Sequence, residues 1–184
     1  MAKQFPAISD KHRAFIEAQK IFFTGSCAAG TRVNISPRST AHLHVLGPNA
    51  VAYLDLTGSG SETAAHVKAG GALTLMLCAF EGAPLILRLY GNGRIAFRGT
   101  SDYAVFLDRF YGGAEPAGAR QIVFLAVDLV QTSCGYAVPF FDHVGERPTL
   151  DRWAEAKGEA GLRAYRAEKN ATSLDGLPTG FRDP

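Results

Sequence analysis

The segment Val51–Val67, VAYLDLTGSGSETAAHV, brings two glycines and a run of hydroxyl side chains to the point where a predicted strand passes into a predicted helix. Gly58 and Gly60 allow a ligand to approach the backbone closely, because neither carries a side chain. The hydroxyl groups belong to Thr57, Ser59, Ser61 and Thr63. Hydroxyls beside the free N–H groups of a first helical turn are suited to binding phosphate. The predicted chemistry is recognition of a phosphorylated ligand such as a nucleotide or a flavin.

This turn does not match the common nucleotide-binding motifs. A P-loop needs a lysine after its last glycine, and none follows Gly60. A dinucleotide-binding fingerprint needs a third glycine, which Thr63 replaces, although Glu81 stands at a suitable distance for its acidic residue. The plainest alternative is a flexible loop in which Ser61 caps the helix. Glu62 in the first turn counts against a phosphate there unless its charge points away.

Candidates for cations and polar contacts lie on two other predicted strands. Arg88 stands in the apolar run LILRLY, where an unpaired charge would be costly. It is therefore a candidate for binding phosphate, with a structural salt bridge or an exposed position as the alternatives. Arg38 is a second candidate cation. Asn34 and Ser36 share one face of a strand by alternation, and that face points either to a ligand or to solvent.

The histidines and cysteines do not predict a metal site. His42 and His44 alternate on one strand face, but no third ligand follows at a sensible spacing. His66 is expected at the surface or at an interface. The three cysteines are widely spaced and odd in number, and we expect them to be reduced thiols.

The composition is that of a folded protein with a sizeable core. The chain has 184 residues, of which 47% are hydrophobic and 20% charged, and its net charge is +2. The basic residues are spread along the chain, which does not favour nucleic-acid binding. No apolar run is long enough to span a membrane, and the N-terminus is too polar for a secretory signal. We expect a cytoplasmic protein with one domain over residues 1–148 and a helical extension over 149–184 that packs on that domain or on a partner subunit.

Hydrophobic periodicity predicts about seven strands and several helices. Short turns between the early strands indicate antiparallel neighbours, and Gly91 and Gly93 are expected to bend the longest strand. The pattern predicts a mainly β (α+β) fold, an antiparallel barrel with peripheral helices. The predicted strands are 20–26, 32–36, 41–46, 50–56, 73–80, 85–97 and 120–132, and the predicted helices are 11–19, 61–70, 101–110, 150–157 and 161–169.

The order and spacing of several segments resembles the pyridoxamine 5′-phosphate oxidase-like proteins, which are flavin-binding split β-barrels. The resemblance covers nearly the whole chain and is greatest to an uncharacterised branch of these proteins. The segments are FIEAQKIFF (15–23), RVNISPR (32–38), YLDLTGSGSETAAH (53–66), LILRLYGNGRI (85–95), QTSCGYAVP (131–139), DRWAEAKG (151–158) and KNATSLDGLP (169–178).

The resemblance implies a six- to seven-stranded antiparallel split β-barrel that forms a homodimer with FMN at the subunit interface. Such a protein would be a flavin-dependent oxidoreductase. The strand over 33–38 would run along the flavin, the end of the strand over 50–56 and the start of the next helix would hold the phosphate, and the loop after 133 would approach the flavin of the other subunit. The residues expected at the cofactor are Asn34, Ser36, Pro37, Arg38, Tyr53, Leu54, Thr57, Ser59, Ser61, Glu62, Thr63, Arg88, Cys134 and Gly135.

The sequence departs from the oxidases proper at the phosphate site. Those proteins carry Ser-Arg-Lys where this chain has Ser61-Glu62-Thr63, so two cations are missing and Arg38 or Arg88 is expected to compensate. The pyridoxal phosphate-binding residues of the oxidases have no counterparts in the tail, and pyridoxamine phosphate is not the expected substrate. Two alternatives stay open: an F420-dependent reductase on the same fold, and a flavin or haem carrier without turnover. The sequence assigns no catalytic residue.

Overall fold

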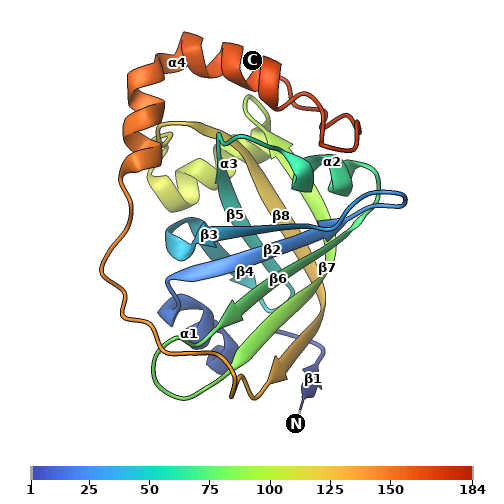
Figure 1. Cartoon of the computed structure of the whole chain (residues 1–184), viewed down its shortest axis with the longest axis vertical. Helices are drawn as coiled ribbons and strands as arrows, with labels where there is room; N and C mark the ends of the chain where they lie inside the picture. The colour runs from blue at the N-terminus through green and yellow to red at the C-terminus, as the bar shows by residue number, and fades with distance from the viewer. Residues whose placement is uncertain (1, 184) are drawn as a thin grey trace.

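Turn residues divide the chain into short antiparallel strands, which a computed structural model covering residues 2–183 shows as one strongly curled sheet (Figure 1). Ser9 caps the first helix as the sequence predicts, because its side chain accepts from the backbone N–H of His12. In chain order the elements are β1 (Lys3–Phe5), α1 (Asp10–Ala18), β2 (Ile21–Cys27), β3 (Asn34–Ser39), the 3₁₀ turn η1 (Thr40–His42), β4 (Leu43–Gly47), β5 (Ala50–Leu56), α2 (Glu62–Lys68), β6 (Ala72–Cys78), β7 (Ile86–Phe97), α3 (Ser101–Tyr111), β8 (Ala119–Ser133) and α4 (Thr149–Lys169).

The sheet has eight strands over the described residues, in the order β3-β2-β6-β7-β8-β5-β4, with β1 pairing with β8. The mainly β split-barrel fold is therefore confirmed, with one strand more than the sequence predicts. The strands β3 and β4 follow each other closely but do not pair, because η1 turns the chain away and places them at opposite ends of the sheet order. The expectation that the early strands are all neighbours is wrong at this point. The break leaves an opening between β3 and β5.

Strand pairing decides which side chains of β3 face the interior. Phe22, Thr24 and Ser26 of β2 are buried, and they pair with Arg38, Ser36 and Asn34 of β3. Cross-strand partners share a face of the sheet, so these three polar side chains point to the inside of the barrel. The neighbouring Val33 and Ile35 are 68% and 69% exposed. One edge strand thus has a polar inner face and an apolar outer face.

The chain after β8 runs along the open side of the barrel and then crosses its end as α4 (Figure 1). Gly158 breaks the helical backbone inside α4 with φ of 63°, which divides it much as the sequence predicts. No helix among residues 2–183 is long and apolar enough to cross a membrane.

Candidate functional site

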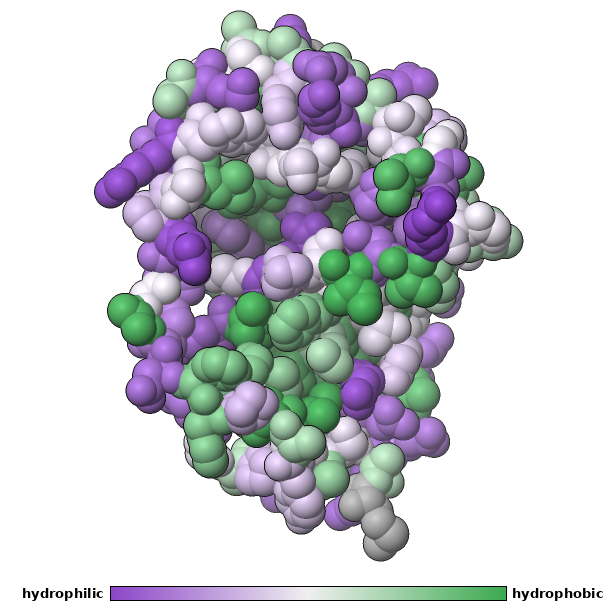
Figure 2. Space-filling view, in the orientation of Figure 1, coloured by the Kyte–Doolittle hydropathy of each residue, from purple (hydrophilic) through white to green (hydrophobic). Residues whose placement is uncertain are grey.

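The opening between β3 and β5 holds a cavity of about 840 Å³, which we call the β3–β5 cavity. Figure 2 shows the molecule hollowed at this level, with hydrophilic side chains inside the hollow. Its walls are the inner face of β3, the end of β5, the Gly/Ser turn (residues 57–61) and the start of α2. Two separate polar segments of the sequence are therefore brought to one site by the break in the sheet.

Most of the residues that the sequence predicts at a cofactor line this cavity. They are Asn34, Ser36, Pro37, Arg38, Tyr53, Leu54, Ser59, Ser61, Glu62 and Thr63. Asn34 Nδ2 lies 3.3 Å from Ser36 Oγ, so these two side chains share a face as the alternation predicts.

The other predicted residues lie elsewhere. Thr57 is buried behind the turn and donates to the carbonyl oxygen of Gly118 at 2.7 Å. Arg88 stands on the outer face of β7, because Leu87 and Leu89 on either side of it are fully buried. Its Nη1 donates to Ser133 Oγ at 3.2 Å, which corresponds to the structural alternative.

The loop residues predicted near the flavin do not reach this cavity in the protomer. Cys134 is exposed. Gly135 has a φ of 63° and packs against the backbone of Leu85 at the start of β7. Whether they approach a partner's cofactor stays a prediction.

Four buried polar atoms on the cavity wall have no hydrogen-bond partner in the described protein. They are Arg38 Nε, Tyr53 OH, Ser61 Oγ and Thr63 Oγ1. Leaving a buried polar atom unpaired costs about 1–3 kcal/mol, so native structures rarely gather several in one place. Burial raises the pKa of Tyr53 to about 12, which keeps its hydroxyl protonated and able to donate. The wall therefore presents free donors to whatever occupies the cavity.

A buried carboxylate organises the cations at this wall. Asp55 is paired with Arg38, and its Oδ2 accepts from Arg120 Nε at 3.0 Å and from Gln121 Nε2 at 2.7 Å. Burial alone would raise its pKa, but the charges of Arg120 and Arg38 hold the pKa of Asp55 below its usual range. Two guanidinium groups against one carboxylate leave an excess of one positive charge.

Sequence reasoning missed Asp55 and Arg120. The available signal was a charge inside an apolar strand, VAYLDL, the same signal that drew attention to Arg88.

The Gly/Ser turn is held from behind by side chains of β8 and α4. Arg120 Nη2 donates to the carbonyl oxygen of Gly60 at 2.9 Å, and Asn170 Nδ2 donates to that of Gly58 at 3.0 Å. Arg166 Nη1 lies 3.3 Å from Thr57 Oγ1. The turn is therefore a fixed structure rather than the flexible loop of the alternative interpretation.

The histidine pair lies beside the cavity and bonds to a tyrosine. His42 Nδ1 is 2.9 Å from Tyr111 OH, and His44 Nε2 is 3.4 Å from the same hydroxyl. Within residues 2–183 no group of three or more potential ligands is placed to hold a metal. His66 is buried, with Nδ1 3.0 Å from Ser26 Oγ, so the expectation of a surface position is wrong. The helix α2 packs against β2 and carries His66 inward.

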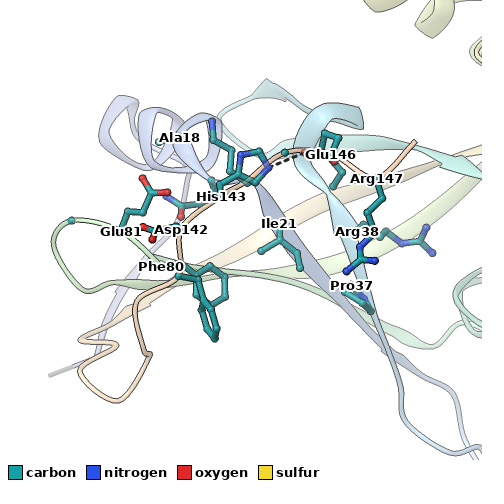
Figure 3. Close-up of a pocket in the computed structure, with 16 residues that line it drawn as sticks. Ala18, Ile21, Pro37, Arg38, Phe80, Glu81, Asp142, His143, Glu146 and Arg147 are labelled. Atoms are coloured by element: carbon teal, nitrogen blue, oxygen red, sulfur yellow. Dashed lines mark ion pairs between the residues drawn. The ribbon is translucent and has the colours of Figure 1, made fainter. Parts of the chain in front are cut away.

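A second pocket of about 800 Å³ adjoins the cavity and shares Pro37, Arg38, Ser39, Glu146 and Arg147 with it. Figure 3 shows Arg38 and Arg147 at one end, Glu81 and Asp142 at the other, and Phe80 and Ile21 between them. His143 and Glu146 form an ion pair of 3.5 Å along its rim.

Comparisons with known proteins agree on one family. No profile of a known protein family matches the chain. The chain is 35% identical over 190 residues to the pyridoxamine 5′-phosphate oxidase family protein ustO of Aspergillus flavus, covering 95% of this chain and 76% of that protein. HupZ of Group A Streptococcus superposes with a TM-score of 0.55 at 16% identity, over 68% of this chain and 99% of that chain. A pyridoxamine 5′-phosphate oxidase assigned by similarity in Lactobacillus delbrueckii superposes with a TM-score of 0.52 at 15% identity, over 68% and 94% of the chains. At these identities the two structures bear on the fold alone.

Proposed function

Because this chain belongs to the pyridoxamine 5′-phosphate oxidase family, whose split-barrel fold is associated with flavin binding, we propose that it binds FMN in the β3–β5 cavity. The observation that carries the proposal is the set of unpaired buried donors on one wall, at Arg38, Tyr53, Ser61 and Thr63. A phosphate ester offers several strong acceptors and a negative charge, and it is recognised by fixed donors with at least one cation. The residues present therefore fit the phosphate end of FMN.

The remaining polar residues of the cavity suit the rest of the molecule. Asn34 and Ser36 point inward from β3 and supply amide and hydroxyl groups for the ribityl chain or the ring edge. Glu62 would repel a phosphate, but both of its carboxylate oxygens accept from the backbone N–H of Leu174, at 3.0 and 3.1 Å. The charge that counted against a phosphate at this turn is thereby engaged by the tail.

We propose further that the protein is a flavin-dependent oxidoreductase. When bound, the isoalloxazine ring supplies hydride or electron transfer, and the protein supplies binding, orientation and electrostatics. The excess positive charge of the Arg38–Asp55–Arg120 group favours an anionic ligand in the cavity. The adjoining pocket, which shares Arg38 and Arg147 with the cavity, gives room for the molecule that exchanges electrons.

The outer face of the sheet supports a homodimer as the working form. Val33 and Ile35 stand exposed on the apolar outer side of the strand whose inner side lines the cavity. Figure 2 shows apolar side chains gathered over β2, β6 and β7 next to the hollow. A second copy covering this face would bury that surface and bring its own residues close to the cavity.

A titration of the purified protein with FMN and with riboflavin tests the proposal. We expect FMN to bind more tightly than riboflavin, because only FMN carries the phosphate, and the visible spectrum of the bound flavin reports binding directly. Tyr53→Phe removes one unpaired hydroxyl and is expected to weaken FMN binding, while Tyr165→Phe on α4 is the matched control. A protein that takes up neither flavin would refute the proposal. Anaerobic reduction of the loaded protein with NADH, NADPH or reduced F420 then separates a reductase from a carrier.

A further inference from the structure

We propose that the C-terminal latch, residues 166–179, positions the phosphate end of the β3–β5 cavity, with Asn170 and Arg166 as its positioning residues. The inference rests on the proposed function, because it concerns how the FMN phosphate is held. It assigns a role to a segment that has no hydrophobic periodicity and that sequence reasoning left unassigned.

The latch is fixed by buried polar groups rather than by an apolar face. Arg166, Asn170 and Thr179 are each 0% exposed. Thr179 Oγ1 donates to the carbonyl oxygen of Asn170 at 2.7 Å, and the backbone N–H of Thr179 donates to that of Ala171 at 3.1 Å. Burying a polar group is costly unless it is hydrogen-bonded, so these groups tolerate few alternative positions. The latch has the geometry of a positioning element.

The latch binds the back of the Gly/Ser turn. Asn170 donates to the carbonyl oxygen of Gly58, and Arg166 bonds to Thr57 just before it. Carbonyl oxygens repel phosphate oxygens, so a turn carbonyl bound from behind is kept from competing with the donors of Ser61 and Thr63. The latch thereby selects a conformation of the turn that suits an anion.

Two further contacts extend the influence of the latch to the charges at the cavity. Asn170 Oδ1 accepts from Arg120 Nη1 at 2.8 Å, and Arg120 is bonded to Asp55, the partner of Arg38. The backbone N–H of Leu174 binds the carboxylate of Glu62. One segment therefore supports the cation of the cavity and also restrains the anion next to it.

Coupling between two sites is reciprocal, so the FMN phosphate should in turn stabilise the latch. Hydrogen exchange of the wild-type protein measures this without any substitution. We expect FMN to slow exchange of the amides of Ser173, Gly176 and Thr179, which are hydrogen-bonded within the latch, and riboflavin to slow it much less. Equal protection by the two flavins, or none by FMN, would overturn the proposal.

A pair of opposite substitutions in the same segment completes the test. Asn170→Asp keeps an acceptor for Arg120 but loses the donor to Gly58, and it adds a negative charge. Asp175→Asn is the matched control, because Asp175 binds Arg32 of the β2–β3 hairpin rather than the Gly/Ser turn. We expect Asn170→Asp to lower FMN affinity about tenfold or more and riboflavin affinity far less, since a lost charge-assisted contact has that size. Asp175→Asn should leave both affinities within about twofold, because an exposed ion pair contributes little.

The ratio of FMN affinity to riboflavin affinity separates positioning from general destabilisation, which would lower both affinities together. If Asn170→Asp folds and keeps the wild-type ratio, the latch is structural only and the inference is wrong. If the wild-type protein binds no flavin, the proposed function itself fails, and the two failures are distinguished. If Asn170→Asp does not fold, the hydrogen-exchange comparison on the wild-type protein decides.

Discussion

Arg38 carries the positive charge that the β3–β5 cavity presents to a ligand. Its guanidinium group is held by Asp55 and lies over the ring of Tyr53, 4.9 Å from the ring centroid, so its orientation is fixed before a ligand binds. Nε remains without a partner. A preorganised cation with a free donor is the arrangement that phosphate recognition requires.

Arg38→Ala is therefore expected to weaken FMN binding by about 1.5–3 kcal/mol, or roughly 10- to 100-fold. The fold should persist, because Asp55 keeps its bonds to Arg120 and Gln121. Fluorescence titration with FMN measures the effect, and Arg94→Ala, whose exposed side chain pairs with Asp102, is the control. Unchanged FMN affinity in Arg38→Ala would mean that the phosphate is held elsewhere.

The two histidines beside the cavity make the free energy of unfolding depend on mildly acidic pH. Burial lowers the pKa of His42, opposed by Asp151 and Glu146. Burial also lowers the pKa of His44, assisted by the positive charges of His42 and Arg109. Below about pH 6.5, the ordinary histidine pKa, the unfolded chain takes up protons that the folded protein does not. Stability should therefore fall as the pH drops from about 7 to 5.

Urea unfolding of the wild-type protein and of a His42→Gln/His44→Gln variant at several pH values checks this expectation. The variant should show a shallower decline over the same pH range, whatever its absolute stability. The contribution of Asp55, whose pKa is held below its usual range, is lost only at pH values below about 4, so it does not overlap this range. Parallel declines in the two proteins would mean that other groups cause the pH dependence.

At the scale of elements, the long strand β7 depends on a glycine at its centre. The register between β7 and β8 shifts between Tyr90 and Gly91, as expected for a bend at this position. A Cβ atom at Gly91 would overlap the backbone carbonyl oxygen of Ala126, which cannot move as a side chain can. The bend allows one strand to serve both ends of the curled sheet.

Gly91→Ala is expected to lower the free energy of unfolding by about 1–3 kcal/mol, as overpacking against a backbone atom does. Gly47→Ala is the control, because a Cβ there meets nothing within 4 Å. It should change stability by no more than about 0.5 kcal/mol in urea unfolding. Similar stabilities of the two variants would show that β8 yields to the added methyl group.

Most elements of this fold could be predicted from the sequence because their signals are local. Alternating apolar residues and turn residues define β5 and β7 almost to the residue, and Ser9 marks the start of α1. The three-residue strand β1 has no such signal, since it exists only through pairing with β8. The separation of β3 from β4 is likewise decided by the closure of the whole sheet.

The candidate site divides in the same way. Asn34, Ser36 and the hydroxyls of the turn could be predicted, because each lies in a short polar pattern. The pairs that support them could not, since Asp55 and Arg120 are 65 residues apart and Asn170 and Gly58 are 112 apart. Arg88 was a reasonable candidate for the opposite reason, because a single strand does not reveal which of its faces is inside.

At the scale of the whole molecule, β3 joins the cavity to the proposed dimer interface. Its inner residues line the cavity, and its exposed outer side chains alternate with them. An exposed edge strand with an apolar face invites pairing with another chain unless a partner covers it. Formation of the dimer and binding of FMN should therefore depend on each other.

Ile35→Glu places a charge on the outer face of β3 without touching the cavity, and we expect it to convert the dimer to the 19.7 kDa protomer. Val105→Glu is the matched control, because Val105 is 64% exposed on α3, away from β3. Analytical ultracentrifugation measures the oligomeric state, and FMN titration at several protein concentrations measures the linkage. If the interface completes the site, Ile35→Glu weakens FMN binding and the wild-type affinity falls on dilution. A wild-type protein that is monomeric and binds FMN with full affinity would show that one protomer holds the cofactor alone.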